Sequence, residues 1–315
     1  MRVVWWTEAG PPEVLVPGEA PDPVPGPGQL LVSVEISGIS FIETMIRAGR
    51  MPRQGVVPPA VLGNAVGGTV AATGPGVDGR WLGRRVVSGT GGAGGYAELA
   101  LAAEADAVEV PEGLDLPSAV ALLADGRTGL GLHRVAGPRA GETVLVEAAA
   151  GGLGTVLVQL AVAAGARVIG AVSSEPKARL VRDLGAEPLD YTAAGWTERL
   201  PPDGLDVGYD GVGGPIGAAV LAAMRPGGRF LVHGLASGGL TDVSAPPEGV
   251  VVHGIGTLGE IGVRAHELSV AALAEAAAGR LRAIVGQTYP LAEASRAHAA
   301  LDAREALGKT LLTVR

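Results

Sequence analysis

The stretch of the sequence best suited to chemistry is a glycine-rich turn within VLVEAAAGGLGTVLVQLA, residues 144–161. Gly151, Gly152 and Gly154 follow a predicted strand and open a predicted helix. Glycine lets the backbone approach a pyrophosphate, and a helix N-terminus offers unpaired N–H groups and a positive dipole end. The strict G-x-G-x-x-G spacing is not met, because Ala149 stands at its first position. The strand–turn–helix context favours a dinucleotide site, with a purely structural turn as the alternative.

A second glycine-rich loop, GVGGPIG at residues 211–217, also follows a predicted strand. Its spacing differs from the fingerprint, and Pro215 is a helix-start signal in its own right. We therefore expect this loop to border the far part of the cofactor and not to hold the pyrophosphate.

The end of the next predicted strand, RVIGAV at residues 167–172, indicates which dinucleotide is bound. An NAD site usually has an acidic residue at this point, whereas this chain has Ser173 and Ser174, with Lys177 one helical turn later. Hydroxyls and an ammonium suit the 2′-phosphate of NADPH, and a charge-assisted contact is worth roughly 1.5–3 kcal/mol. The alternative is a surface lysine beside a serine that caps the helix.

The elements that must position these residues fall into two textures. Residues 1 to about 120 consist of short apolar runs separated by proline and glycine, which is typical of a small β-barrel or sandwich. After Pro117 apolar strands alternate with helices, which predicts βαβ units and a parallel sheet. The fold class expected is therefore α/β.

Composition excludes several functions. Charged residues make up 18% of the 315 residues, the net charge is −8, and no cluster of Lys and Arg suggests a nucleic-acid partner. The absence of cysteine excludes disulfides, thiolate catalysis and sulfur-based zinc sites. The five histidines show no ligand spacing, so no metal is expected.

No N-terminal secretion signal is visible, and no apolar run reaches the ~20 residues of a membrane span. We expect a cytoplasmic protein without a membrane partner.

The order of several motifs along the chain carries a family resemblance. AAAGGLG, VIGAVSSEPKA, LGAEPLDY and the final GKTLL follow a β-rich part that contains VLGNAVGGTVAATGPGV and GGYAEL. In this respect the chain resembles the zinc-independent, zeta-crystallin-like NADPH:quinone oxidoreductase branch of the medium-chain dehydrogenase/reductase superfamily. The resemblance runs over nearly the whole length.

The resemblance implies a fold and an activity. It implies a GroES-like β-barrel catalytic domain at residues 1–122, completed by residues 265–315, and a Rossmann doubly wound parallel-sheet domain at residues 123–264. It implies binding of NADPH and reduction of a small-molecule quinone or of the C=C bond of an α,β-unsaturated carbonyl. A homodimer paired through an edge of the Rossmann sheet is also implied.

Carried over by position, the resemblance also implies roles for individual residues. The backbone of Gly151, Gly152 and Leu153 would contact the pyrophosphate. Ser174, Lys177 and Tyr191 would hold the 2′-phosphate. The remaining residues would line the path to the nicotinamide or take part in catalysis. The cofactor-binding positions are Ser40, Thr128, Gly151, Gly152, Leu153, Ser173, Ser174, Lys177, Tyr191, Val212, Gly234 and Leu235, and the catalytic positions are Ser40, Glu43 and Thr128.

The chain departs from the family pattern in ISFIETMIRAGRMP, where the family usually carries Asn, Asp and two tyrosines. The matching residues are Ser40, Glu43, Met45 and Met51, so both tyrosines, which are potential proton donors, are missing. Glu43 is either a replacement acid or a residue that makes a structural bond within its helix. The zinc alcohol dehydrogenases of the same superfamily have a Gly-His-Glu triplet. At the matching place this chain has Gly-Asn-Ala, residues 63–65.

These observations predict hydride transfer from NADPH to a quinone or an electron-poor C=C bond. Positioning alone can supply roughly 7–11 kcal/mol of the barrier, so loss of a proton donor need not abolish activity. Ser40 or Thr128 could stabilise charge that develops on the acceptor's oxygen. Two alternatives stay open: an NADPH-binding sensor or structural protein with little turnover, and a tailoring enoyl reductase for a bulky secondary metabolite.

Overall fold

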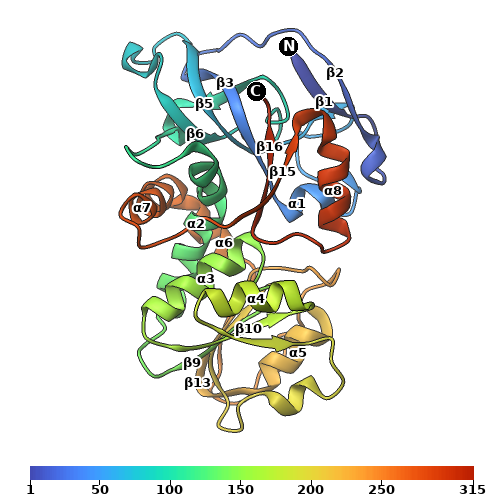
Figure 1. Ribbon diagram of the computed structural model, residues 1–315, viewed down its shortest axis with the longest axis vertical. Coiled ribbons are helices and arrows are strands. Elements are labelled where there is room, and N and C mark those ends of the chain that lie inside the picture. The colour runs from blue at the N-terminus through green and yellow to red at the C-terminus, as the bar shows by residue number, and fades with distance from the viewer. The chain divides into compact units, whose positions relative to one another are not determined.

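The computed structural model describes all 315 residues, and its internal contacts divide them into two compact units (Figure 1). The first unit is Met1–Ala124 with Ser269–Arg315, and the second is Asp125–Leu268. The domain limits implied by the family resemblance, residues 1–122 with 265–315 and residues 123–264, stay a prediction.

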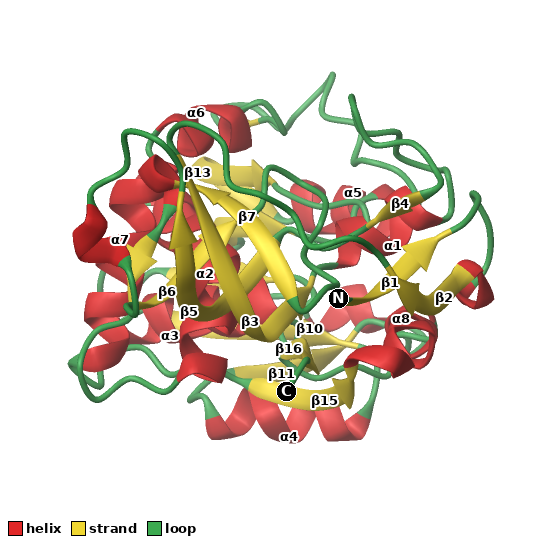
Figure 2. Ribbon diagram, turned by 90° about the horizontal axis from the view of Figure 1, so that it is seen from above, coloured by secondary structure: helices red, strands yellow, loops and turns green.

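The first unit is built around two β-sheets. The larger has the order β15-β16-β3-β5-β6-β8, with β7 paired to β3, and the smaller has the order β2-β1-β4. Figure 2 shows β3, β5 and β6 side by side. The bounds are β1 (Arg2–Trp6), β2 (Leu15–Glu19), β3 (Gln29–Ile39), β4 (Ala60–Val61), β5 (Ala65–Thr73), β6 (Arg85–Gly89), β7 (Leu99–Ala103), β8 (Val108–Glu109), β15 (Val285–Pro290) and β16 (Lys309–Thr313).

The C-terminal segment completes this first unit. Strand β16 pairs antiparallel with β3, with Thr310 opposite Ile39 and Thr313 opposite Ile36. The last residues of the chain therefore share a sheet with residues near the start.

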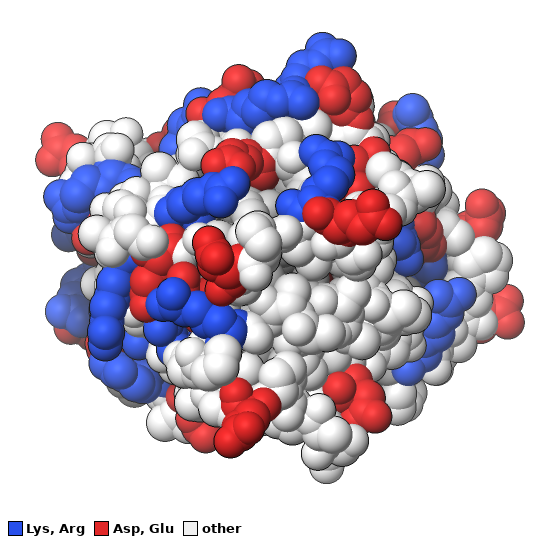
Figure 3. Space-filling model, turned by 90° about the horizontal axis from the view of Figure 1, so that it is seen from below, with Lys and Arg blue, Asp and Glu red and all other residues white.

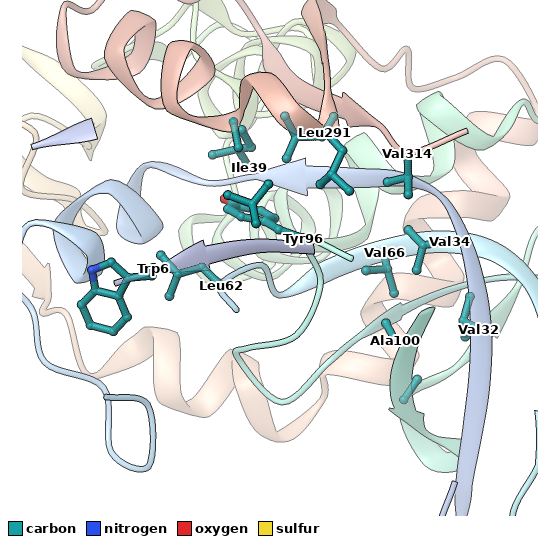
Figure 4. Packing of buried hydrophobic residues seen from close by; sticks show 14 of the residues in the cluster. Trp6, Val32, Val34, Ile39, Leu62, Val66, Tyr96, Ala100, Leu291 and Val314 are labelled. Carbon is teal, nitrogen blue, oxygen red and sulfur yellow. The ribbon is translucent and has the colours of Figure 1, made fainter. Parts of the chain in front are cut away.

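Strand β3 shows why these segments form a sheet. Its sequence QLLVSVEISGI alternates along most of its length between buried and half-buried positions, the period of two that places alternate side chains on one face. The buried face packs into an apolar cluster in which Trp6 and Tyr96 are the large aromatic members, together with Val32, Val34 and Val66 (Figure 4).

Short helices and 3-10 turns flank the sheets of the first unit. Two polar contacts involve these elements: Arg47 Nη2 lies 2.7 Å from Oδ2 of the partly exposed Asp302, and the buried Tyr96 hydroxyl lies 2.9 Å from His298 Nε2. The elements are η1 (Pro12–Val14), α1 (Phe41–Arg47), η2 (Gly79–Trp81), η3 (Glu104–Asp106), α7 (Ala265–Ala277), η5 (Leu291–Glu293) and α8 (Ala294–Asp302), with α2 (Leu116–Ala136) and α7 each contributing residues to both units.

The second unit contains a six-stranded sheet in the order β11-β10-β9-β12-β13-β14, and every neighbouring pair is parallel. This is the doubly wound order, with the switch point between β9 and β12. The elements are β9 (Thr143–Val146), α3 (Gly152–Ala163), β10 (Arg167–Val172), α4 (Glu175–Asp183), β11 (Glu187–Asp190), η4 (Trp196–Arg199), β12 (Leu205–Asp210), α5 (Gly214–Ala222), β13 (Met224–Val232), β14 (Val251–His253) and α6 (Thr257–Val263).

The central strands of this sheet are buried along nearly their whole length. All six residues of β12 are buried, as are five of the six residues of β10. Such continuous burial is typical of a parallel sheet whose two faces are both covered. The α/β fold predicted from the sequence is confirmed.

The surface carries charges of both signs, and no helix is a candidate membrane span. On the face shown in Figure 3, Lys and Arg are interleaved with Asp and Glu, and a broad area carries neither. None of the helices is both long enough and apolar enough to cross a membrane.

Candidate dinucleotide site

The glycine turn lies where the sequence predicts it, between the end of β9 and the start of α3. Gly151 is the residue before the helix, and its N–H donates to the Ala148 carbonyl at 2.9 Å. The left-handed residue of the turn is Ala148, with a φ of 47°, whereas neither Gly151 nor Gly152 has a positive φ. These two glycines therefore matter for the side chain they lack and not for an unusual backbone conformation.

Gly154 sets how closely the helix approaches the strand. A Cβ atom at this position would lie 2.2 Å from the Ala148 carbonyl oxygen and 2.8 Å from Ala149 Cα. A Cβ atom on Gly151 would meet only the Ala148 oxygen within 4 Å, at 3.3 Å. The N-terminal N–H groups of the 12-residue helix α3 thus lie beside backbone that carries little side chain, which fits a diphosphate.

Ser173, Ser174, Lys177 and Tyr191 gather at the carboxyl end of β10. Lys177 Nζ lies 3.0 Å from Ser173 Oγ, and the Tyr191 N–H donates to the Val172 carbonyl at 3.1 Å. All four are half-buried. The ammonium and the hydroxyls form a donor set that fits a phosphate monoester.

The alternative for this region was a surface lysine beside a serine that caps helix α4. Ser174 precedes α4, but its side chain makes no capping hydrogen bond to the helix. Glu175 is directed to arginines, with Arg182 Nη1 at 2.9 Å and Arg179 Nε at 3.7 Å. The serine therefore does not act as a side-chain cap, and the nearby acid is engaged in ion pairs.

Val212, Gly234 and Leu235 lie in the loops that follow β12 and β13, and these two loops touch. The Ser237 N–H donates to the Val212 carbonyl at 2.8 Å. A Cβ atom on Gly234 would lie 2.4 Å from the Gly211 carbonyl oxygen. The strand order places both loops at the same edge of the sheet as the glycine turn.

Two buried acids at this edge, Glu147 and Asp210, were not predicted from the sequence. Glu147 Oε2 accepts from the Val212 N–H at 2.8 Å, and Asp210 Oδ1 accepts from the Gly213 N–H at 2.7 Å. Burial, with the neighbouring Asp210 carboxylate, raises the pKa of Glu147 to about 9. The signal in the sequence was an acid that ends each of two apolar strands, TVLVE and LDVGYD.

The proposed catalytic residues do not all lie in one unit. Thr128 is half-buried on α2 in the second unit, whereas Ser40 and Glu43 belong to the first unit. The predicted residues that follow strands β9, β10, β12 and β13 lie at one edge of the sheet in the second unit. Thr128 belongs to the same unit but lies on helix α2.

Glu43 forms a capping box at the start of α1. Glu43 Oε2 accepts from the Ser40 N–H at 2.6 Å and from its hydroxyl at 3.0 Å, and Oε1 accepts from the Asn64 N–H at 2.8 Å. Burial raises the pKa of Glu43, while these donors and the Lys309 ammonium oppose the shift. The carboxylate therefore holds Ser40 and the start of the helix, as the structural alternative requires.

A parallel doubly wound sheet with a bare helix N-terminus at its carboxyl edge, and an ammonium and hydroxyls after the next strand, is typical of dinucleotide-binding proteins of the dehydrogenase class. Comparison with known proteins specifies the family. Residues 26–112 match the model of the alcohol dehydrogenase GroES-like domain, and residues 152–277 that of the zinc-binding dehydrogenase family.

The chain is 37% identical to a quinone oxidoreductase of Pseudomonas aeruginosa, over 96% of each protein, and 32% identical to a 2-haloacrylate reductase of a Burkholderia species, over 91% of each. It also superposes on the Escherichia coli quinone oxidoreductase complexed with NADPH, with a TM-score of 0.92, 29% identity and full coverage of both chains. The chain belongs to the medium-chain dehydrogenase/reductase superfamily, in its zinc-independent quinone oxidoreductase branch.

The first unit thus has the GroES-like fold and the second the Rossmann fold, as predicted. One family model is named for zinc, but the chain has no cysteine, and no three His, Cys, Asp or Glu side chains are grouped as metal ligands.

The close packing at Gly154 yields a prediction. In Gly154→Ala the new methyl group would collide with the Ala148 carbonyl, so we expect the free energy of unfolding to fall by about 1–3 kcal/mol or more. Urea unfolding followed by circular dichroism measures this. Gly259→Ala on α6, where nothing lies within 4 Å of the added atom, is the matched control and should be neutral or stabilising. Equal stability of the two variants would contradict the close-packing interpretation.

Proposed function

We propose that the chain transfers hydride from NADPH to a quinone or to the electron-poor C=C bond of an α,β-unsaturated carbonyl, without a metal. It is an NADPH-dependent oxidoreductase. The observation that carries the choice of cofactor is the pairing of Lys177 with Ser173 at the end of β10, where NAD sites usually have an acid. The E. coli relative that superposes on this chain was crystallised with NADPH, which supports the same choice.

The chain's own residues would divide the cofactor between them. The backbone of Gly151, Gly152 and Leu153 would hold the diphosphate at the start of α3, and Lys177 with its neighbouring hydroxyls the 2′-phosphate. The remaining contacts proposed from the family resemblance are Ser173, Ser174 and Tyr191 at the adenosine end, Val212, Gly234 and Leu235 along the dinucleotide, and Thr128 at the nicotinamide amide.

The bound cofactor supplies the hydride, and the protein must stabilise the charge that hydride transfer creates on the acceptor's oxygen. Ser40 and Thr128 are the hydroxyl groups proposed for this task. The Ser40 hydroxyl, which donates to Glu43 Oε2 in this structure, would turn from Glu43 toward the acceptor. Glu43 is better suited to positioning than to proton transfer, because its two carboxylate oxygens already accept hydrogen bonds from Ser40 and Asn64.

Both acceptor classes have support among the relatives. One is named a quinone oxidoreductase, and the other, a 2-haloacrylate reductase, is named for a conjugated C=C substrate. The buried Met45 stands where the family usually has a tyrosine, so a side-chain proton donor is absent at that position. Water can complete protonation of a reduced quinone, whereas an enone gains more from a placed hydroxyl.

A homodimer is proposed from the edge of the Rossmann sheet. Strand β14 is one of the two edge strands of the sheet, opposite β11, and Val251 on it is 50% exposed. An uncovered strand edge presents unpaired N–H and C=O groups that a second copy can pair. The cytoplasmic location stays a prediction.

Turnover separates the proposed enzyme from an NADPH-binding sensor. We expect purified protein to oxidise NADPH, followed by its absorbance, in the presence of at least one member of a panel of quinones and enones. Ser40→Ala should lower kcat/KM on the order of a hundredfold, and Ser33→Ala on β3 is the control. Tight NADPH binding with no oxidation across the panel would favour the sensor.

The cofactor choice is tested by Lys177→Ala. Removal of the ammonium should weaken NADPH binding about tenfold to a hundredfold and leave NADH binding nearly unchanged, because only NADPH carries the 2′-phosphate. Calorimetric titration with both dinucleotides measures this. Arg179→Ala, a change of an exposed cation on the same helix, is the control. An equal loss for both dinucleotides would overturn the assignment.

The proposed dimer is tested by Val251→Lys, which places a charge on the exposed edge strand. Light scattering should give twice the mass of the chain for the wild type and the mass of the monomer for the variant. A wild-type monomer at micromolar concentration would rule out this assembly.

A further inference from the structure

The buried acid pair of Glu147 and Asp210 is not used by the proposed reaction. Glu147 directly follows β9 and Asp210 ends β12, and both side chains are fully buried. The strands are neighbours, and the Glu147 N–H donates to the Tyr209 carbonyl at 3.0 Å. The pair therefore lies under the switch point of the sheet.

Each acid holds one backbone N–H of the loop at residues 211–214. Glu147 binds that of Val212 at 2.8 Å, and Asp210 binds that of Gly213 at 2.7 Å. Gly213 has a φ of 74°, and a Cβ atom on it would lie 2.2 Å from the Gly239 carbonyl oxygen. Because Val212 also accepts from Ser237 in the next loop, the acid pair anchors two loops that border the proposed cofactor site.

The second carboxylate oxygen of each acid lacks a hydrogen-bond donor, which a shared proton would supply. Glu147 Oε1 and Asp210 Oδ2 are buried and have no other hydrogen-bond partner. Two adjacent buried carboxylates cannot both be ionised without a large cost in free energy. A proton shared by the two side chains would give both oxygens a partner, in agreement with the pKa of Glu147, which burial and the neighbouring Asp210 carboxylate raise.

The neighbouring ionisable groups do not supply a compensating charge. Burial lowers the pKa of His233, which follows β13, to about 4, so that its ring is neutral. Burial raises the pKa of the Tyr209 hydroxyl on β12, and Arg229, the cation that opposes this shift, is paired with Glu142. On the side of α5, Asp210 Oδ1 and the Thr241 hydroxyl both lie beside Gly217, and the hydroxyl carries no charge.

We propose that Glu147 is a positioning residue for the dinucleotide: the proton that it shares with Asp210 fixes the loop 211–214, and loss of this proton weakens NADPH binding. The inference rests on the proposed function. The folded chain keeps the proton to a higher pH than the unfolded chain does. The free energy of unfolding therefore falls as the pH rises toward the raised pKa of Glu147. The affinity for NADPH falls as the pH rises through that pKa, because the free folded chain then loses the proton that binding needs.

The test compares the wild type with Glu147→Gln and Glu147→Ala from about pH 7 to about pH 10, by NADPH titration and by thermal unfolding without cofactor. Glutamine keeps both hydrogen bonds, since its carbonyl accepts from Val212 and its amide donates to Asp210. We expect the glutamine variant to bind NADPH within about twofold of the wild type near neutral pH, and the alanine variant about tenfold more weakly.

Across the pH range the wild type should lose about tenfold more affinity than the glutamine variant, and its melting temperature should fall further. Asp210→Asn is a second variant: it removes the neighbouring charge that keeps the proton on Glu147, so its pH profile should differ from that of the wild type.

Parallel profiles for the wild type and Glu147→Gln, with normal NADPH binding near neutral pH, would overturn this inference alone. Binding by the glutamine variant as weak as that of the alanine variant would also overturn it, since a charged carboxylate would then be required. Failure of the wild type to bind NADPH at neutral pH would overturn the proposed function as well.

Discussion

The close approach of helix α3 to strand β9 is the constraint on which the proposed site depends. This packing requires a residue without a Cβ atom at position 154, because the Cβ atom of any other residue would collide with the carbonyl oxygen of Ala148. With this packing in place, the first N–H groups of the helix lie directly after the strand, where a diphosphate can reach them. The parallel strand order then brings the loops after β10, β12 and β13 to the same edge.

Chemical specificity is added at the ends of the neighbouring strands. Lys177 and Ser173 lie beside each other after β10, at the position where NAD sites usually have an acid. On the other side of β9, buried acids hold the backbone of the loop that carries Val212. The proposed site therefore has a cation, Lys177, on one side of β9. On the other side, hydrogen bonds to Glu147 and Asp210 hold the loop in place.

The features that could be predicted from the sequence are those in which residue type fixes local structure. Alternation of apolar strands and helices predicted the parallel sheet, and glycines between a strand and a helix predicted the turn. The left-handed Ala148 was not predicted, because such a conformation favours glycine and the first glycine of the turn is Gly151, three residues later. Glu147 and Asp210 were missed because an acid at the end of an apolar strand is ordinarily taken as the start of a loop.

Glu43 illustrates a different limit. Its residue type allows both a catalytic acid and a structural bond, and the sequence alone left both open. Three-residue spacing from Ser40 is the pattern of a capping box, and the structure shows both reciprocal hydrogen bonds. The contact with Asn64, 21 residues away in the chain, depends on how the strands are arranged and could not be read from local spacing.

Hydrogen–deuterium exchange of the wild-type chain, with and without saturating NADPH, tests the central claim most directly. The account predicts slower exchange in peptides that cover residues 151–155, 173–177 and 211–214, since these carry the backbone that would hold the cofactor or border it. NADPH bound with unchanged exchange in all three segments would contradict the account.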